Sequence, residues 1–134
     1  FTTVEDATKF VRESDCDWLS VAVGSVHGAI AANLLDKKKP AAKLDIERIT
    51  ELEAALNMPL VLHGGSGIEN DYILRGIQAG IAKINVYTDI ILAGKRALAE
   101  HPDASYTDGL CLAREAMKEA TLEKLRVFGS AGKA

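Results

Sequence analysis

The sequence predicts an α/β fold in which parallel strands alternate with helices, and two observations carry this prediction. First, short apolar runs at 18–23, 59–63 and 82–86 are interpreted as strands, and the run at 18–23 is typical of a strand covered on both faces, as in a parallel sheet. Second, each run is followed by apolar residues at helical spacing. Strict alternation of strand and helix implies right-handed crossovers and one parallel sheet.

The ends of the three strands favour a (β/α)8 TIM barrel over a doubly wound sheet. Both folds place their sites at the carboxyl ends of strands, but a doubly wound sheet gathers its site at one switch point. Here all three strands lead to polar or metal-capable residues, near positions 27, 63 and 85. A complete barrel takes about 250 residues. A chain of 134 residues would therefore supply roughly half of one.

Five helices are expected, and polar or glycine residues mark several of their ends. Thr3 can cap the first helix, Asn70 can cap the third, and Gly80 suits the left-handed residue after it. Thr88 or Asp89 begins the fourth helix. The expected helices run over residues 4–14, 45–56, 70–80, 88–100 and from 107 or 108 to a short tail at 128–134.

Composition indicates one globular domain. The 48% hydrophobic content can form a sizeable core, and a net charge of −3 gives no broad basic field for a nucleic acid or an anionic membrane. No apolar run reaches the roughly 18 residues of a membrane span, and the first residues lack the features of a signal peptide. We therefore expect a soluble, cytoplasmic protein.

Two smaller features have simple interpretations. Cys16 and Cys111 lack CxxC spacing and are expected to be reduced, buried thiols. The lysine run at 37–39 is interpreted as a solvated loop tip, and its alternative role is to help attract an anionic substrate.

Two histidines follow neighbouring strands and are candidate metal ligands. His27 and His63 stand past the carboxyl ends of strands that should pair about 4.8 Å apart, so their imidazoles could converge on one ion. Neutral imidazole suits zinc, but a catalytic zinc usually takes three protein ligands. The remaining histidine, His101, precedes a proline at the end of a helix and is expected to have a surface or capping role. Structural roles for His27 and His63 are the alternative.

The turn after His63 reads Gly-Gly-Ser-Gly and could bind a phosphate. A glycine-rich turn between strand and helix can aim backbone amides and the Ser66 hydroxyl at an anion, but it can equally be a tight turn that needs positive φ. One strand later, Asn85 could donate to a developing oxyanion and Thr88 to the phosphate. Helix capping is the alternative role, chiefly for Thr88.

Three motifs together resemble one enzyme family. Residues 21–28 read Val-Ala-Val-Gly-Ser-Val-His-Gly, residues 62–67 read Leu-His-Gly-Gly-Ser-Gly, and residues 83–89 read Lys-Ile-Asn-Val-Tyr-Thr-Asp. In this order and spacing they resemble the class II, zinc-dependent fructose-bisphosphate aldolases and their tagatose-bisphosphate relatives, and the tail at 128–134 is similar to tails of that family. The resemblance implies that residues 1–134 are the C-terminal portion of a single TIM-barrel aldolase domain, with about its last three βα units and a C-terminal helix.

The resemblance also implies a role for each motif. His27 and His63 would be two of the three zinc ligands, zinc would polarise the ketone, and Asn85 would help to hold the enediolate. A monovalent cation would fit the family pattern beside the zinc. Some family members carry aspartate where this chain has Tyr87, so the Tyr87 backbone is the expected contact. Dihydroxyacetone phosphate would be held by Gly28, Gly64, Gly65, Ser66, Asn85, Val86, Tyr87 and Thr88.

Part of the family's active site has no counterpart in this sequence. In the family, the third histidine ligand follows the aspartate that acts as general acid or base, on an earlier strand, and no matching Asp-His pair occurs here. We therefore expect a fragment, or the ordered part of a longer aldolase. This segment alone should not complete the zinc site or the proton transfer.

The expected reaction is the reversible cleavage of fructose 1,6-bisphosphate to dihydroxyacetone phosphate and glyceraldehyde 3-phosphate, in glycolysis and gluconeogenesis. Tagatose 1,6-bisphosphate, which differs at one hydroxyl stereocentre, is the alternative substrate. Alternatives from other classes are a non-catalytic phosphosugar-binding half barrel and a zinc hydrolase that uses Asp36 or Glu69. Unpaired strand edges and the family pattern imply a homo-oligomer, either a dimer or a tetramer.

Overall fold

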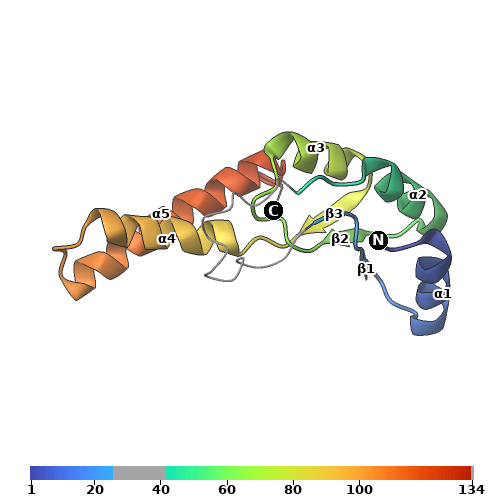
Figure 1. Cartoon of the computed structure of the whole chain (residues 1–134), viewed down its shortest axis with the longest axis horizontal. Coiled ribbons are helices and arrows are strands. Elements are labelled where there is room, and N and C mark those ends of the chain that lie inside the picture. The colour runs from blue at the N-terminus through green and yellow to red at the C-terminus, as the bar shows by residue number, and fades with distance from the viewer. Residues whose placement is uncertain (26–41, 134) are drawn as a thin grey trace. The chain divides into compact units, whose positions relative to one another are not determined.

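The computed structural model describes residues 1–25 and 42–133, which divide into two compact units. The first unit, Phe1–Asn85, contains the sheet and helices α1 to α3 (Figure 1). The second unit, Val86–Ala134, contains helices α4 and α5. The lysine run at 37–39 lies outside the described residues.

Three parallel strands form the sheet of the first unit, in the spatial order β1-β2-β3. Their bounds are Leu19–Ser20 for β1, Leu60–Leu62 for β2 and Ile81–Ile84 for β3. Leu19 pairs with Leu60, and Leu60 pairs with Ile81. The predicted α/β class and the parallel pairing of the three strands are therefore confirmed over the described residues.

Strand β2 matches its prediction, whereas β1 is shorter and more accessible than predicted. All three β2 residues are buried, as a central strand covered on both faces requires. Ser20 in β1 is exposed, and Trp18, which was expected to open a covered strand, is 56% exposed. The prediction of a strand covered on both faces was wrong there, because buried and exposed residues alternate: Val21 and Val23 are buried, whereas Ser20 and Ala22 are exposed. A hydrogen bond from Val21 N to Val61 O (3.2 Å) still continues the ladder beyond β1.

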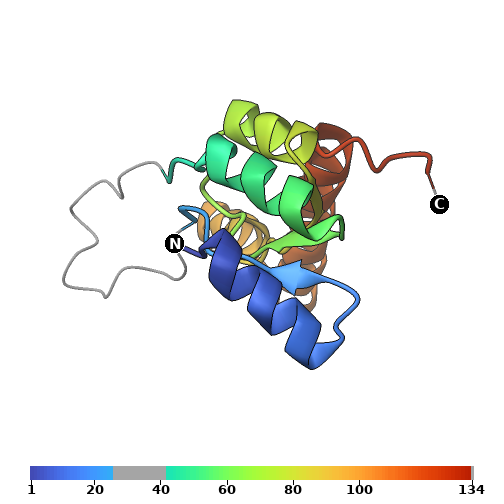
Figure 2. The ribbon, with the colours of Figure 1, turned by 90° about the vertical axis from the view of Figure 1, so that its right-hand side faces the viewer.

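The core of the first unit joins the sheet to helices α2 and α3. Ile49 and Leu52 of α2 are fully buried, three residues apart on one helix face. Helices α2 and α3 lie side by side (Figure 2). The largest fully buried side chains are Val23, Ile49, Leu52, Leu60, Leu62 and Ile73.

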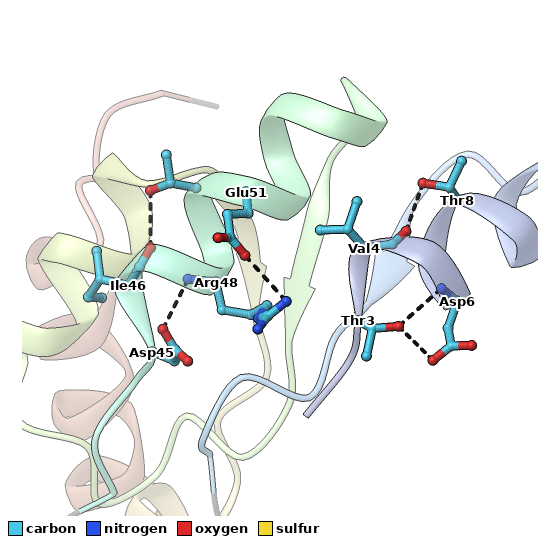
Figure 3. A network of polar contacts seen from close by, with 9 residues as sticks. Thr3, Val4, Asp6, Thr8, Asp45, Ile46, Arg48 and Glu51 are labelled. Carbon is cyan, nitrogen blue, oxygen red and sulfur yellow. Dashed lines mark hydrogen bonds and ion pairs between the residues drawn. The ribbon is translucent and has the colours of Figure 1, made fainter.

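Side-chain caps fix the starts of the first two helices (Figure 3). The helices of the first unit are α1 (Val4–Ser14), α2 (Ile46–Leu56) and α3 (Asn70–Gln78). The Thr3 hydroxyl accepts a hydrogen bond from Asp6 N (3.1 Å), as predicted, and the Asp45 carboxylate accepts one from Arg48 N (3.0 Å). Each cap satisfies a backbone amide that has no partner within the helix.

Helix α3 begins differently from its prediction. The cap position belongs to Glu69, without a side-chain cap hydrogen bond, and Asn70 is already the first helical residue. The predicted Asn70 cap was therefore wrong. Ile68, only 4% exposed, is anchored in the core immediately before the helix, and this packing overrides the local preference for asparagine at a cap. The left-handed backbone predicted for Gly80 is confirmed by its φ of 123°.

Substituting Gly80 by alanine is expected to destabilise the protein by about 3 kcal/mol. The new Cβ would lie 2.7 Å from Glu53 Cβ and closer still to Glu53 Cγ, in a backbone conformation that L residues rarely adopt. Gly67→Ala is the matched control, because Gly67 also has a positive φ, of 75°, but no heavy atom within 4 Å of the added Cβ. Its expected cost is about 1 kcal/mol. Equal costs in urea unfolding would show that the contact with Glu53 is unimportant.

The second unit is a pair of helices packed along their length, α4 (Thr88–Glu100) and α5 (Tyr106–Val127). Helix α4 starts at Thr88, as predicted. Helix α5 starts at Tyr106, earlier than the predicted Thr107 or Asp108, because the Ser105 hydroxyl accepts a hydrogen bond from Asp108 N (3.2 Å) and caps it. The two helices approach closely at Gly94, which is buried against Met117.

Both cysteines are free, as predicted, but neither is buried. Cys16 is half-buried and Cys111 is exposed, so the prediction of buried thiols was wrong. Cys111 lies on α5, whose residues in the described structure are largely accessible. None of the described helices combines the length and apolar character that a membrane crossing requires.

Candidate functional site

His63 stands at the point where the central strand ends and is exposed to solvent. Leu62, the last residue of β2, is completely buried, so the strand is anchored up to the residue before the histidine. The register pairs Val61 with Lys83 and Leu62 with Ile84. Asn85 N donates to Leu62 O (2.9 Å), which continues the ladder by one residue. This register places His63 and Asn85 next to each other at the carboxyl edge of the sheet.

The side chains of His63 and Asn85 are in contact. Asn85 Nδ2 lies 3.1 Å from His63 Nε2 and 3.3 Å from His63 Nδ1. The contact therefore places the Asn85 amide beside the imidazole of the candidate metal ligand.

Lys83 orients the Asn85 amide. Its Nζ donates to Asn85 Oδ1 over 2.8 Å. Lys83 lies in β3 and Asn85 follows its last residue, so the two are two positions apart along the ladder and lie on the same face of the sheet. Because Lys83 engages the amide oxygen, the amide nitrogen is the group turned toward His63. This contact of Lys83 was not among the expectations from the sequence, and the signal available for it was the Lys-x-Asn spacing at the end of a strand.

The turn after His63 contains the positive φ angles that its glycines predicted. Gly64 and Gly67 have φ values of 71° and 75°, in the left-handed region, so the tight-turn interpretation is confirmed for them. Gly65 is buried, and its N–H donates to Asn85 O (3.0 Å), which ties the turn to the end of β3. Ser66 is half-buried within the turn. The role of the four residues in phosphate binding stays a prediction.

The second predicted phosphate segment, residues 86–88, opens the second unit. Val86 and Tyr87 precede α4, and Thr88 is its first helical residue. The cap position belongs to Tyr87, which makes no side-chain cap hydrogen bond, so the capping role considered for Thr88 is wrong. Tyr87 is 72% exposed.

Several candidate residues lie outside the described part of the chain. These are His27 and Gly28, proposed for zinc and substrate, and Asp36, proposed for a hydrolase. Within residues 1–25 and 42–133, no three His, Cys, Asp or Glu side chains form a group that could hold a metal ion. Among the predicted ligands, His63 is the one that the described residues include, and it fits zinc because its imidazole is exposed at the carboxyl edge of the sheet and imidazole is a common zinc ligand.

His101 has the capping role that the sequence predicted. It is the C-cap residue of α4, is exposed, and has its Nδ1 atom 3.0 Å from Ala97 O. This contact satisfies a carbonyl of the last helical turn. His101 is therefore a useful comparison for His63.

A family model described as fructose-bisphosphate aldolase class-II matches residues 1–133. The chain belongs to this family. The class II aldolase resemblance carried by the three sequence motifs is thus confirmed.

Three curated relatives are 37% or 38% identical to this class II aldolase chain. They are the YdjI protein of Escherichia coli strain K12 (37% identical over 134 residues), the sulfofructosephosphate aldolase of Alkalicoccus urumqiensis (37% over 138) and the 6-phospho-5-dehydro-2-deoxy-D-gluconate aldolase of Shouchella clausii (38% over 139). The matches cover 99% to 100% of this chain and 45% of each relative. The chain therefore spans about half the length of these relatives.

Solved structures of class II aldolases have the same fold over this length. The crystal structure of the YdjI aldolase from Escherichia coli K12 matches with a TM-score of 0.85 at 36% identity, covering 100% of this chain and 47% of that one. A putative fructose-1,6-biphosphate aldolase from Coccidioides immitis matches with a TM-score of 0.83 at 27% identity, covering 98% of this chain and 44% of that one.

Proposed function

We propose that the intact protein carrying this chain is a zinc-dependent aldolase that cleaves a ketose phosphate reversibly and releases dihydroxyacetone phosphate. One observation carries the proposal: the exposed His63 imidazole and the Asn85 amide meet at the carboxyl ends of neighbouring parallel strands, in a chain of the class II aldolase family. In (β/α)8 barrels, the active sites lie at the carboxyl ends of the strands. A (β/α)8 barrel is the fold that we propose for the intact protein.

His63 and His27 would hold the zinc. The third ligand would come from a part of the intact protein outside these 134 residues. When bound, zinc supplies a Lewis acid that polarises the substrate carbonyl. The parallel pairing of β1 with β2 supports the convergence of the two histidines, because the segment that follows β1 leads to His27. A monovalent cation nearby stays part of the proposal.

Asn85 would stabilise the negative charge that develops on the substrate oxygen when the carbon–carbon bond breaks. Its Nδ2 donor already lies at the edge where the reacting carbonyl would bind, and Lys83 holds it there. A donor oriented before the reaction costs no reorganisation during it, which is the condition for effective charge stabilisation.

Each of two backbone segments would offer donors to a substrate phosphate. The first is the turn with Gly64, Gly65 and Ser66, where Gly65 would act by fixing the turn because its amide donates to Asn85. The second is residues 86–88 with the start of α4, whose 13 residues present the positive end of a helix dipole. Gly28 would complete this set.

Fructose 1,6-bisphosphate is the proposed substrate, with tagatose 1,6-bisphosphate as the alternative. Two curated relatives are named for sulfofructosephosphate and for 6-phospho-5-dehydro-2-deoxy-D-gluconate, so the panel of substrates to test includes both. All four compounds carry a phosphate, which the proposed site would bind. They differ in the part of the molecule released as the aldehyde.

The test is to incubate the intact protein with each of the four compounds and to follow dihydroxyacetone phosphate by coupled reduction. We expect one compound to exceed the others at least tenfold in kcat/KM. Release of dihydroxyacetone phosphate from none of them would contradict the proposal. Binding of the compounds without cleavage, unaffected by a chelator, would indicate a non-catalytic phosphosugar-binding module instead.

We also propose that the protein is a homo-oligomer. The described surface exposes large apolar side chains, including Phe10, Trp18, Tyr106 and Leu110, which are 53% to 84% exposed. Exposed apolar surface of this kind is commonly covered by association, and the part of it that the rest of the proposed barrel does not cover would be available to a second copy. Light scattering of the intact protein should give a mass of two or four chains, and a monomer would contradict this proposal.

Lys83→Met is expected to lower kcat about tenfold, because the Asn85 amide loses the charge-assisted hydrogen bond that orients it. KM should change less than twofold, since Lys83 acts through Asn85. Lys83→Arg should recover most of the rate. Lys95→Met, at an exposed position on α4, is the control and should match the wild type. If Lys95→Met lowered kcat as much as Lys83→Met, the proposed role of Lys83 in orienting Asn85 would be contradicted.

A further inference from the structure

The second unit contains an ion pair that is more enclosed than the others in the described part of the chain. Lys124 Nζ lies 3.0 Å from Asp89 Oδ2, and the side chains are 18% and 29% exposed. For comparison, the pair of Lys118 and Glu115 on the same helix is 59% and 51% exposed. Partial burial reduces screening by solvent, so Lys124 and Asp89 attract each other more strongly than the exposed pairs do.

The position of Asp89 makes this pair relevant to substrate binding. Asp89 is the second residue of α4 and directly follows the segment 86–88 proposed to bind the phosphate. A carboxylate in the first turn stabilises a helix, but it repels a phosphate bound at the same end. Lys124 comes from the last turns of α5 and brings a positive charge to this carboxylate.

We propose that Lys124 is a positioning residue that neutralises Asp89, so that a dianionic phosphate can bind at the start of α4. This inference rests on the proposed function, since it concerns the proposed phosphate site. The lysine acts through Asp89: it holds the carboxylate on the α5 side and offsets its charge. The sequence offers no sign of this, because 35 positions separate the two residues.

A purely structural role for the pair would predict something different. Helices α4 and α5 are already packed along their length, with Met117 against Gly94 and Leu98 against Gly109. Loss of one ion pair should therefore leave the helix pair folded. A structural role would change thermal stability and leave the affinity for phosphate unaffected.

The experiment measures the affinity of the intact, zinc-loaded protein for dihydroxyacetone phosphate and for inorganic phosphate by calorimetry. We expect Lys124→Met to weaken both about fivefold and to raise KM with little change in kcat. Lys124→Arg should bind like the wild type, and so should the control Lys118→Met. Asp89→Asn should bind at least as tightly as the wild type. The double variant Lys124→Met/Asp89→Asn should return to within twofold of wild-type affinity.

Two results would overturn the inference alone. One is wild-type affinity in Lys124→Met, and the other is a double variant as weak as Lys124→Met, which would mean that Lys124 acts on the phosphate directly or through packing. Failure of the wild type to bind either probe would overturn the inference together with the proposed phosphate site. Phosphate binding with the expected pattern, but without cleavage of any ketose phosphate, would support the inference and contradict the aldolase proposal.

Discussion

His63→Ala should reduce aldol cleavage by at least about a thousandfold and lower the zinc content of the purified protein. The variant removes the proposed metal ligand at the end of β2 and, with it, the ring that contacts the Asn85 amide. Because His63 is exposed and follows the buried strand, its removal should leave the fold intact. Cleavage is measured by release of dihydroxyacetone phosphate, and zinc by elemental analysis of the same sample.

His101→Ala is the control for this prediction. His101 is also exposed, but it caps α4 through Ala97 O and is not part of the proposed zinc site. Its substitution should change the rate less than twofold and leave the zinc content unchanged. If the two alanine variants retained equal zinc and equal rates, His63 would not be a metal ligand.

Leu62→Ala should lower the free energy of unfolding by about 3 kcal/mol. Leu62 is completely buried at the end of the central strand, so truncation leaves a cavity between the sheet and its helices. Leu74→Ala on α3 is the control, because Leu74 is 44% exposed, and its expected cost is below about 0.5 kcal/mol. The measurement is urea unfolding of the intact protein.

The Leu62 variant also has an expected effect on activity. Asn85 N donates to Leu62 O, so a shift of the β2 backbone would move His63 and Asn85 relative to each other. Activity should fall even under conditions where the variant is fully folded. A stability loss no larger than that of the Leu74 variant would contradict the assignment of β2 as the centre of the core.

The sequence predicted β2 better than its neighbours for a physical reason. A central strand buried on both faces needs consecutive apolar residues, and residues 60–62 have them. A strand with one covered face needs an apolar residue only at every second position. The apolar run at 18–23 therefore suggested a longer and more covered strand than β1, in which Trp18 would be buried; Trp18 is exposed. Helix bounds followed from apolar spacing, while the Asn70 cap failed because burial of Ile68 fixes where α3 begins.

The candidate site was predictable in its backbone and less so in its side chains. Parallel strands end at the same edge, so the proximity of His63 and Asn85 followed from strand order once both strands were recognised. The contacts of Lys83 with Asn85 and of Lys124 with Asp89 depend on side-chain conformation and on the packing of α5, which local sequence patterns do not encode.

The most direct test of the proposed function is metal removal and return in one sample of the intact protein. Release of dihydroxyacetone phosphate from fructose 1,6-bisphosphate, or from the preferred compound of the panel, is measured before chelation, after it, and after addition of zinc. A zinc-dependent aldolase should lose at least about 99% of its rate on chelation and recover it with one zinc per intact chain. A rate unaffected by complete zinc removal would contradict the role of His63 as a catalytic zinc ligand and the proposed mechanism.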